Sequence, residues 1–167
     1  VCRRLIDAGA HVTPVMTKGA LHFVGRTTFS ALASAPVQTE LWDGPDPIPH
    51  TRLGQQADLV IVVPATARII GAYAAGLSTD LLTNVLLTAR CPVVLAPAMH
   101  TEMWEHPATR RNVEVLRERG VLVLDPASGR LTGADTGPGR LPDPAAIVAA
   151  VHDVLRGRAA GRSADLS

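Results

Sequence analysis

Residues 58–63 read DLVIVV, a continuous run of apolar and mostly β-branched side chains that stops at Pro64. Such a run is typical of a strand buried on both faces, and strands of this kind belong to parallel sheets covered by helices. Residues 92–96 (PVVLA), closed by Pro97, repeat the pattern. The sequence therefore predicts a parallel sheet that contains these two buried strands.

Helical and extended segments alternate on either side of the two strands. Further strands are predicted over residues 10–16 and 121–124, and helices over residues 1–8, 53–57, 65–76, 81–89, 107–120 and 144–156. Proline and glycine predict loops over residues 43–49 and 129–142. The alternation predicts an α/β fold with a three-layer, doubly wound parallel sheet.

The N-terminal third of the chain gives weaker signals. Residues 1–8 form a predicted helix with no capping residue before it, so we expect an N-terminal strand and its loop to precede this helix in the native protein. Thr17 is placed to cap a helix that starts near Lys18. The mixed segment that follows has Phe23 and Phe29 as its only large anchors.

The composition excludes several classes of protein. The 167 residues are 47% hydrophobic and 19% charged, which fits one folded domain and not a disordered chain. A net charge of +1 gives no electrostatic case for binding nucleic acid or an anionic membrane. No apolar run reaches the roughly 18 residues of a membrane span. Cys2 and Cys91 form no C-x-x-C pair, which excludes a disulfide scaffold and indicates a reducing, cytoplasmic compartment.

Ligands of doubly wound sheets bind outside the carboxyl ends of the strands. The segments expected there are residues 64–68 (PATAR), 97–104 (PAMHTEMW) and 129–141 (GRLTGADTGPGRL). In the first, small side chains admit a flat ring or a phosphate, and Thr66 and Ala67 offer a hydroxyl and a helix N-terminal amide. The second brings His100 together with methionine and tryptophan. The third has the glycines of a flap that closes over a ligand.

Each of these features also has an interpretation without a ligand. Thr66 could be a simple N-cap, and Met103 and Trp104 could fill the core under the next helix. Residues 129–141 could be a solvated connection, and His50 an idle loop histidine. The sequence lacks the patterns of serine nucleophiles, zinc proteases, Walker-type phosphate loops and G-x-G-x-x-G dinucleotide loops, and it predicts no metal site.

In this order, the segments resemble the flavin-containing cysteine decarboxylases, whose best-known members are the phosphopantothenoylcysteine decarboxylases of coenzyme A biosynthesis. The family signatures are a histidine before L-x-x-x-A-D and a strand, P-A-[ST]-A-N, G-x-x-x-x-L-L, P-A-M-N-x-x-M-W and G-D-x-G-x-G-R-M. The matching stretches are residues 50–53 (HTRL), 64–68 (PATAR), 76–82 (GLSTDLL), 97–104 (PAMHTEMW) and 134–141 (ADTGPGRL). The P-A-M segment followed by M-W is highly specific, and the resemblance covers nearly the whole chain.

The resemblance implies a Rossmann-like flavoprotein decarboxylase domain over residues 1–156, with residues 157–167 as a tail or linker. It implies FMN bound between the subunits of a homo-oligomer, either a trimer or an assembly of trimers. It assigns His50 as the catalytic acid/base near the substrate thiol. The implied substrate-binding residues are His100, Ala98, Met99, Met103, Asp135 and Arg140. The implied cofactor-binding residues are Thr17, Phe23, Pro64, Ala65, Thr66, Ala67 and Asp80.

Three positions depart from the family pattern. Arg68 replaces the usual asparagine of the flavin turn, His100 replaces the asparagine that grips the substrate carboxylate, and Gly133 stands where many members have a cysteine. The fused decarboxylase–ligase proteins of actinobacteria also carry P-A-M-H and L-T-G-A-D, so His100 and Gly133 do not imply lost function. A ligase half is not present in the chain, and the family's glycine-rich first loop would precede Val1.

The leading functional hypothesis is FMN-dependent decarboxylation of 4′-phosphopantothenoylcysteine to 4′-phosphopantetheine. An alternative substrate is the C-terminal cysteine of a peptide, oxidatively decarboxylated to an aminoenethiol in natural-product biosynthesis. Gly133 suits this alternative, because glycine offers no proton for reducing the enethiol. A third hypothesis is a flavin-binding regulatory subunit. The presence of His50 and the P-A-M segment argues against it, because a protein that only binds flavin needs neither.

Overall fold

The structure, a computed structural model, describes residues 1–42, 48–132 and 135–164. Its centre is a three-stranded parallel sheet in the order β1-β2-β3. The strands are β1 (Val60–Ala65), β2 (Val93–Pro97) and β3 (Leu122–Val123). The register pairs Val62 with Leu95 and Val94 with Leu122, which confirms the predicted parallel sheet.

The burial of the two long strands differs from the prediction. Every residue of β2 is buried, because β2 is the middle strand. In β1, by contrast, Val60, Ile61 and Val63 are only half-buried, because β1 lies at an edge of the described sheet. Pro64 also lies within β1 and does not end it. The register shifts between Val62 and Ala65, and such an irregularity accommodates a residue that has no amide hydrogen to donate.

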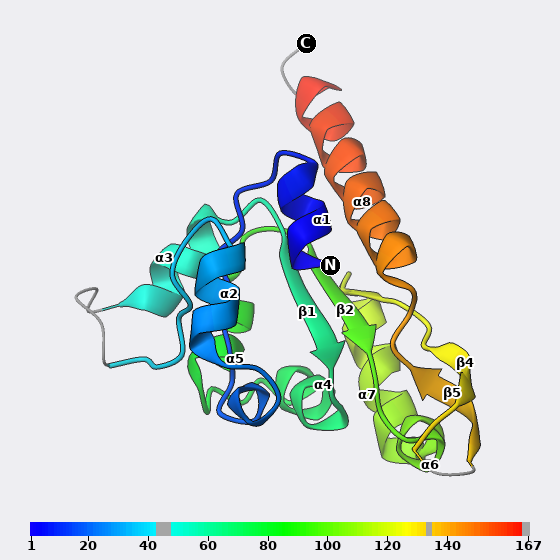
Figure 1. Cartoon of the computed structure of the whole chain (residues 1–167). Coiled ribbons are helices and arrows are strands. Elements are labelled where there is room, and N and C mark those ends of the chain that lie inside the picture. The colour runs from blue at the N-terminus through cyan, green and yellow to red at the C-terminus, as the bar shows by residue number, and fades with distance from the viewer. Residues whose placement is uncertain (43–47, 133–134, 165–167) are drawn as a thin grey trace.

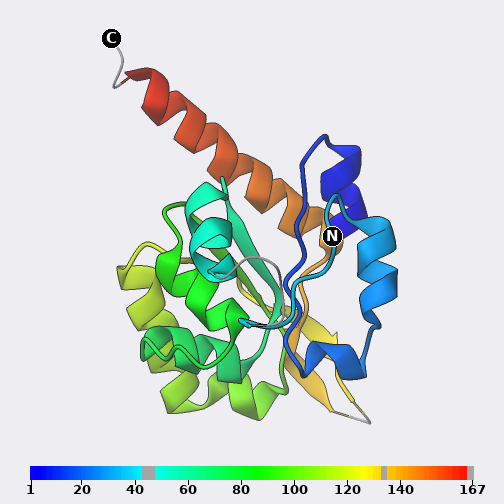
Figure 2. The ribbon, with the colours of Figure 1, turned by 90° about the vertical axis from the view of Figure 1, so that its left-hand side faces the viewer.

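Helices cover the sheet on both sides. They are α1 (Cys2–Asp7), η1 (Ala20–His22), α2 (Arg26–Leu32), α3 (Pro49–Gln56), α4 (Ala67–Ala74), α5 (Leu81–Thr88), α6 (Thr101–Glu105), α7 (Pro107–Glu118) and α8 (Pro144–Ala164). Figure 2 shows α4, α5 and α7 on one side of β1 and the chain from α1 to α2 on the other. This arrangement confirms the predicted α/β fold with helices on both faces of a parallel sheet.

The core is built from small and branched side chains. Ile70 of α4, Leu95 of β2 and Leu116 of α7 have no exposed surface, and they belong to one buried cluster. Ile147 of α8 is also fully buried, so the first half of the last helix packs onto the body of the domain. The helix then continues to Ala164, beyond the predicted end at Arg156. None of the helices in the described ranges is long and apolar enough to cross a membrane.

Two predictions for the N-terminal third were wrong. Residues 10–16 form no strand and make only an isolated bridge, Val15 to Gln38, since Pro14 interrupts the row of donors. Thr17 does not cap a helix from Lys18, although its hydroxyl accepts a hydrogen bond from Ala20 N at 3.2 Å at the start of η1.

The predicted loop 129–142 was also wrong, because most of it is a β-hairpin. Its strands are β4 (Ala127–Arg130) and β5 (Thr136–Arg140), which pair antiparallel. Figure 1 shows the hairpin beside α6, with which β5 is in contact. The other predicted loop, residues 43–49, lies mostly outside the described residues, and its last position, Pro49, begins α3.

Candidate active site

The carboxyl ends of β1 and β2 point to the same end of the molecule, the lower end in Figure 1. Helix α4 begins there directly after β1, and α6 begins there shortly after β2. The β4–β5 hairpin lies beside α6 at the same end. The segments that the sequence singled out after these strands therefore meet at one edge of the sheet.

The turn from β1 into α4 exposes small side chains. Ala65 is fully buried, whereas Pro64 and Thr66 are exposed and Ala67 is half-buried. Thr66 is the N-cap of α4, and its hydroxyl accepts a hydrogen bond from Ile69 N at 3.4 Å. The capping interpretation of Thr66 is thus confirmed. The side chains of residues 65–67 at the start of α4 are small, which suits a flat or anionic group.

Asp80 and Arg68 form an ion pair next to this turn. Arg68 Nη2 lies 3.1 Å from Asp80 Oδ2. Asp80 also caps α5, where its other carboxylate oxygen accepts from Thr83 N at 2.8 Å in a capping box. Burial alone raises the pKa of Asp80, but the hydrogen bonds from Thr83 and Arg68 outweigh it and hold the pKa below its usual value. Asp80 is therefore a charged residue with a structural role, and the predicted cofactor contact remains a prediction.

The segment after β2 is fixed by backbone hydrogen bonds on both sides. Ala98 N donates to Ala65 O of β1 at 3.2 Å, and Met99 N donates to Gly139 O of the hairpin at 2.9 Å. Gly139 has a φ of +149°, and a Cβ placed there would lie 2.2 Å from the Met99 carbonyl oxygen. Only glycine allows the hairpin to approach this closely.

His100 lies between two carboxylates. Its Nδ1 contacts Oε2 of Glu102 on α6, and its Nε2 lies 3.2 Å from Oδ2 of Asp135 in the hairpin connection. The Glu102 hydrogen bond is the main cause that raises the pKa of His100, and Asp135 adds to it. The imidazole is thus favoured as a cation, the form in which both ring nitrogens donate hydrogen bonds.

The hairpin covers Thr101 and presents an arginine. A Cβ at Gly137 would lie 2.6 Å from Thr101 Oγ1, and this hydroxyl is buried with no hydrogen-bond partner among the described residues. Arg140 is exposed at the end of β5, and its side chain runs close above Gly129. The structure therefore brings the predicted residues Ala98, Met99, His100, Asp135 and Arg140 together on two adjacent segments.

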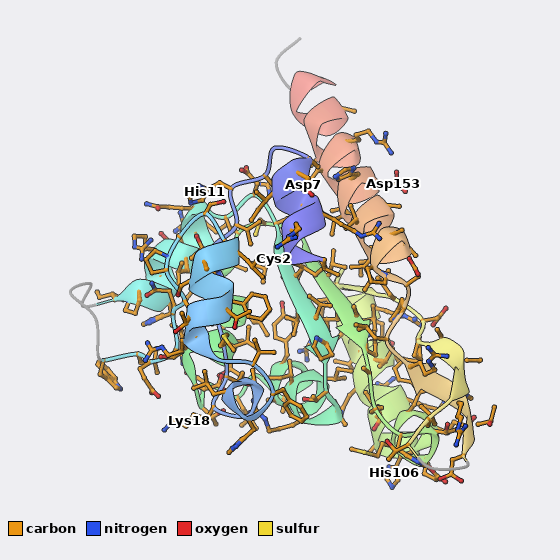
Figure 3. The ribbon with its side chains drawn as sticks, in the orientation of Figure 1. Cys2, Asp7, His11, Lys18, His106 and Asp153 are labelled. Atoms are coloured by element: carbon orange, nitrogen blue, oxygen red, sulfur yellow. The ribbon has the colours of Figure 1, made fainter. Side chains whose placement is uncertain are left out.

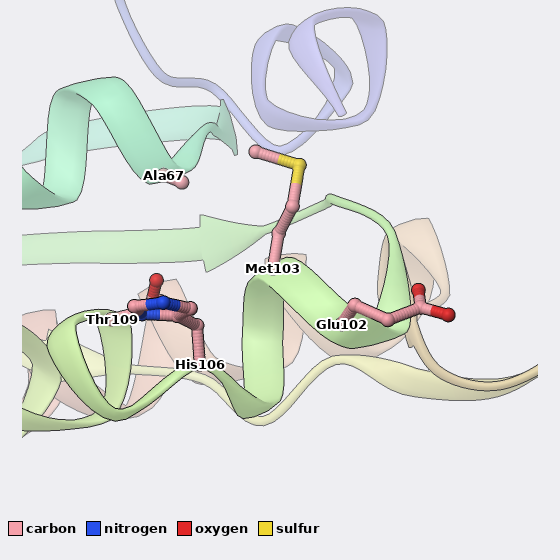
Figure 4. Close-up of a pocket in the computed structure, with 5 residues that line it drawn as sticks. All are labelled: Ala67, Glu102, Met103, His106 and Thr109. Carbon is pink, nitrogen blue, oxygen red and sulfur yellow. The ribbon is translucent and has the colours of Figure 1, made fainter.

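A pocket of about 330 Å³ opens between the starts of α4, α6 and α7 (Figure 4). It is lined by Ala67, Glu102, Met103, His106 and Thr109. Met103 is half exposed and points toward α4, whereas its neighbour Trp104 packs against the core. The interpretation of both as core residues is thus correct for Trp104 alone.

His106 was missed in the sequence. Its Nδ1 accepts a hydrogen bond from Ala108 N at 3.2 Å, and it caps α7 just before Pro107. Proline at the first position of a helix was the available signal, because the residue before it is then the N-cap. Among the described residues, no group of three or more histidine, cysteine, aspartate or glutamate side chains is placed to hold a metal ion.

His50 lies in a different part of the molecule. It is the second residue of α3, and its carbonyl oxygen accepts a hydrogen bond from Thr88 Oγ1 of α5 at 2.9 Å. Its ring atom Nδ1 is buried and has no hydrogen-bond partner in the part of the chain that the structure describes. In Figure 1, α3 lies to the left of the strands and α6 lies at the lower right, beyond the end of β2. The structure therefore does not bring His50 and His100 together within one chain.

The remaining predicted residues, Thr17 and Phe23, flank η1. Lys18, next to Thr17, lies at the same lower end of the molecule as His106 (Figure 3). Phe23 is 90% exposed, so it is no anchor of the core, contrary to the prediction. An exposed aromatic ring at this end of the molecule is free to stack on a ligand.

The fold and the site define a Rossmann-like α/β protein with a ligand site at the carboxyl ends of its parallel strands. The family model described as Flavoprotein matches residues 1–156. The chain therefore belongs to the flavoprotein family.

Curated relatives carry the description coenzyme A biosynthesis bifunctional protein CoaBC. This chain is 59% identical to the protein of Mycolicibacterium smegmatis, in a match that covers 86% of this chain. It is 54% identical to the protein of Mycobacterium tuberculosis, in a match that covers 97% of this chain. These matches cover 34% and 40% of the relatives, so the chain spans well under half the length of either.

Several solved structures match over most of both chains, and they include two decarboxylases. One is a mutant of PPC decarboxylase in complex with pantothenoylaminoethenethiol, with a TM-score of 0.77 and 31% identity over 90% of this chain and 86% of that chain. The other is the FMN-dependent cysteine decarboxylase SpaF, with a TM-score of 0.77 and 30% identity over 94% of this chain and 86% of that chain. The fold of cysteine decarboxylases is thus present here.

Proposed function

We propose that the chain is an FMN-dependent carboxy-lyase that decarboxylates 4′-phosphopantothenoylcysteine to 4′-phosphopantetheine in coenzyme A biosynthesis. The observation that carries the proposal is the match to PPC decarboxylase, at 31% identity over nearly the full length of both chains. The CoaBC relatives support the same assignment with higher identity. We assign the decarboxylase domain to residues 1–156 and place the enzyme in the cytoplasm, which its two unpaired cysteines suit.

The residues present fit FMN. The turn formed by Pro64, Ala65, Thr66 and Ala67 has small side chains, with Pro64 and Thr66 exposed, which leaves room for a flat ring or a phosphate at the start of α4. The exposed ring of Phe23 offers a stacking surface. Thr17 and Asp80 complete the proposed set of FMN-binding residues. When bound, FMN supplies reversible hydride transfer at the carbon that bears the substrate sulfur. The protein contributes binding, orientation and proton transfer.

His100 is proposed to bind the substrate carboxylate. Its raised pKa favours the charged imidazole, and its Nε2 already has a carboxylate, that of Asp135, at 3.2 Å. A substrate carboxylate is the same kind of acceptor, and binding one there requires Asp135 to move aside. Arg140 on the adjacent strand adds a second positive charge for an anionic substrate.

His50 is proposed as the acid/base at the substrate thiol. Because α3 and α6 lie on opposite flanks of one chain, a site that uses both histidines needs two copies of the chain. This supports the proposed homo-oligomer, a trimer or an assembly of trimers, with each site at a contact between subunits. A separated monomer is then inactive.

The proton that completes the saturated product needs a donor. Gly133 has no acidic side chain. Cys2 is on α1 and far from His106 at the site end of the molecule (Figure 3), and Cys91 precedes the amino end of β2, whereas the site lies at its carboxyl end. Both cysteines are half-buried. We therefore assign the role to Asp135, His100 or water at the hairpin, and expect the saturated thiol as the product.

Oxidative decarboxylation of a peptide C-terminal cysteine is the second candidate. It is kept because SpaF, described as an FMN-dependent cysteine decarboxylase, matches this chain with the same TM-score as PPC decarboxylase. The two functions predict different products, the saturated thiol and an enethiol that is lighter by one pair of hydrogen atoms.

The experiment is turnover by the purified, flavin-loaded protein without oxygen. We expect a yellow protein that releases FMN on heating, and many cycles on phosphopantothenoylcysteine with CO₂ and the saturated thiol as products. A colourless protein that cannot be loaded with FMN contradicts the family function. A single turnover that bleaches the flavin and yields the enethiol, or activity on peptides ending in cysteine alone, favours the second candidate.

A further inference from the structure

The two carboxylates that contact His100 come from different parts of the chain, one close to His100 in sequence and one from the hairpin. Glu102 is two residues away in the same short helix, where His100 is the N-cap with an extended backbone (φ −62°, ψ 151°). An N-cap side chain faces the first turn of its helix, which places residue 102 within reach. Asp135 belongs to the connection between β4 and β5. Glu102 therefore belongs to the same local segment as His100, whereas Asp135 approaches the ring from a separate segment of the chain.

The two contacts also occupy different ring nitrogens. Glu102 contacts Nδ1 and Asp135 lies at Nε2. Among the described residues, these two are the charged groups that face the imidazole, one from α6 and one from the hairpin. Figure 4 shows the Glu102 side chain extending away from His106, and its carboxylate contacts the His100 ring.

His100 makes no capping hydrogen bond to the first turn of α6. Its ring is therefore oriented by the two carboxylates, and Glu102 alone remains when Asp135 is displaced. A carboxylate on one ring nitrogen fixes which way the other nitrogen points and favours the charged ring.

We infer that Glu102 is a positioning residue that acts through His100: by binding Nδ1 it directs the Nε2–H at the carboxylate of the substrate. The inference rests on the proposed function, in which His100 binds that carboxylate. In this arrangement the substrate carboxylate replaces Asp135 at Nε2, while Glu102 remains bound at Nδ1.

The test compares Glu102→Gln and Glu102→Ala with a matched control, Glu105→Gln. Glu105 lies on the same helix and is exposed, and neither the pocket nor His100 involves it. The titration midpoint of the His100 imidazole is measured by NMR, with the His100→Asn variant identifying its signal. KM and kcat for decarboxylation are measured across the pH range.

Both Glu102 variants should lower the His100 midpoint, raise KM about three- to tenfold near neutral pH and change kcat much less, because a charge-assisted contact to substrate is weakened. The rise of KM with pH should also begin at lower pH in these variants. Glu105→Gln should change neither quantity.

An unchanged His100 midpoint, or an unchanged KM in an active enzyme, would overturn the inference. A protein whose His100 midpoint depends on Glu102 but which decarboxylates no cysteinyl substrate contradicts the proposed function instead, while the Glu102–His100 pairing stands.

Discussion

The two histidines proposed for catalysis lie in environments that differ in almost every respect. His50 is packed where α3 meets α5, and its Nδ1 is buried with no hydrogen-bond partner within residues 1–42, 48–132 and 135–164. His100 is at the start of α6 with 34% of its side chain exposed and a carboxylate at each ring nitrogen. The buried Nδ1 of His50 suits proton exchange with a bound substrate, and the two carboxylates on His100 favour its charged form, which suits binding an anion.

The largest expected effect concerns His50. His50→Asn should lower turnover by roughly 10²–10⁴-fold, the usual contribution of a general acid/base, while FMN stays bound. Turnover and the flavin absorbance of the purified variant are the measurements. His11→Asn, on an exposed histidine, is the control and should behave as wild type.

Co-expression of His50→Asn with His100→Ala sharpens this prediction. If each site takes one histidine from each of two copies, mixed oligomers contain some intact sites and recover part of the activity. Near-normal turnover by His50→Asn alone would show that His50 is an idle residue.

The next effect concerns His100 and pH. His100→Ala should raise KM roughly ten- to hundredfold, because a hydrogen bond to a charged group is lost, and His100→Asn should recover part of it. Since the Glu102 hydrogen bond raises the pKa of His100, the charged ring is present below that pKa. Wild-type KM should therefore be lowest at the acid side and rise as pH passes through the raised pKa. His100→Asn should lose this rise, and a KM profile identical to wild type would contradict the assignment.

Docking of the hairpin can be tested separately from the charge of His100. Gly139→Ala places a methyl group against the Met99 carbonyl oxygen, so it should lower the free energy of unfolding by about 1–3 kcal/mol and also raise KM. Thermal unfolding and KM are measured together. Gly157→Ala in α8 is the matched control, since nothing lies within 4 Å of the added carbon, and it should stabilise by up to about 1 kcal/mol. Equal effects of the two changes would argue against the docking.

The smallest effect is expected from a change at Asp80, which contacts neither His50 nor His100, and it concerns the free energy of unfolding. Asp80→Ala removes the α5 cap and should cost about 1 kcal/mol of unfolding free energy at neutral pH. Because the folded-state pKa of Asp80 is lowered, its contribution is full above the ordinary aspartate pKa and is lost as pH falls through the folded value. Denaturant unfolding at several pH values measures this. Asp153→Ala, at an exposed ion pair of α8, should cost less at every pH.

Sequence patterns predicted the elements whose signals are local. Helix α5 begins after Asp80, α7 ends before Gly120 and β2 stops at Pro97, as expected from capping and proline rules. The hairpin was missed because glycine and proline indicate a loop when taken alone. Its glycines are needed for contact with Met99 and Thr101, which are about forty residues away in the sequence, so no local pattern could reveal it.

The sequence by itself determined the α/β alternation, the family and the segments that follow the strands, because burial periodicity, capping and short motifs are properties of neighbouring residues. The tertiary structure alone decided that Asp135 and Glu102 flank His100, that Arg68 pairs with Asp80, and that His50 lies on the opposite flank. The physical reason is that charge state and proton transfer depend on distances across the fold. Those distances are set by how helices and the hairpin pack on the sheet.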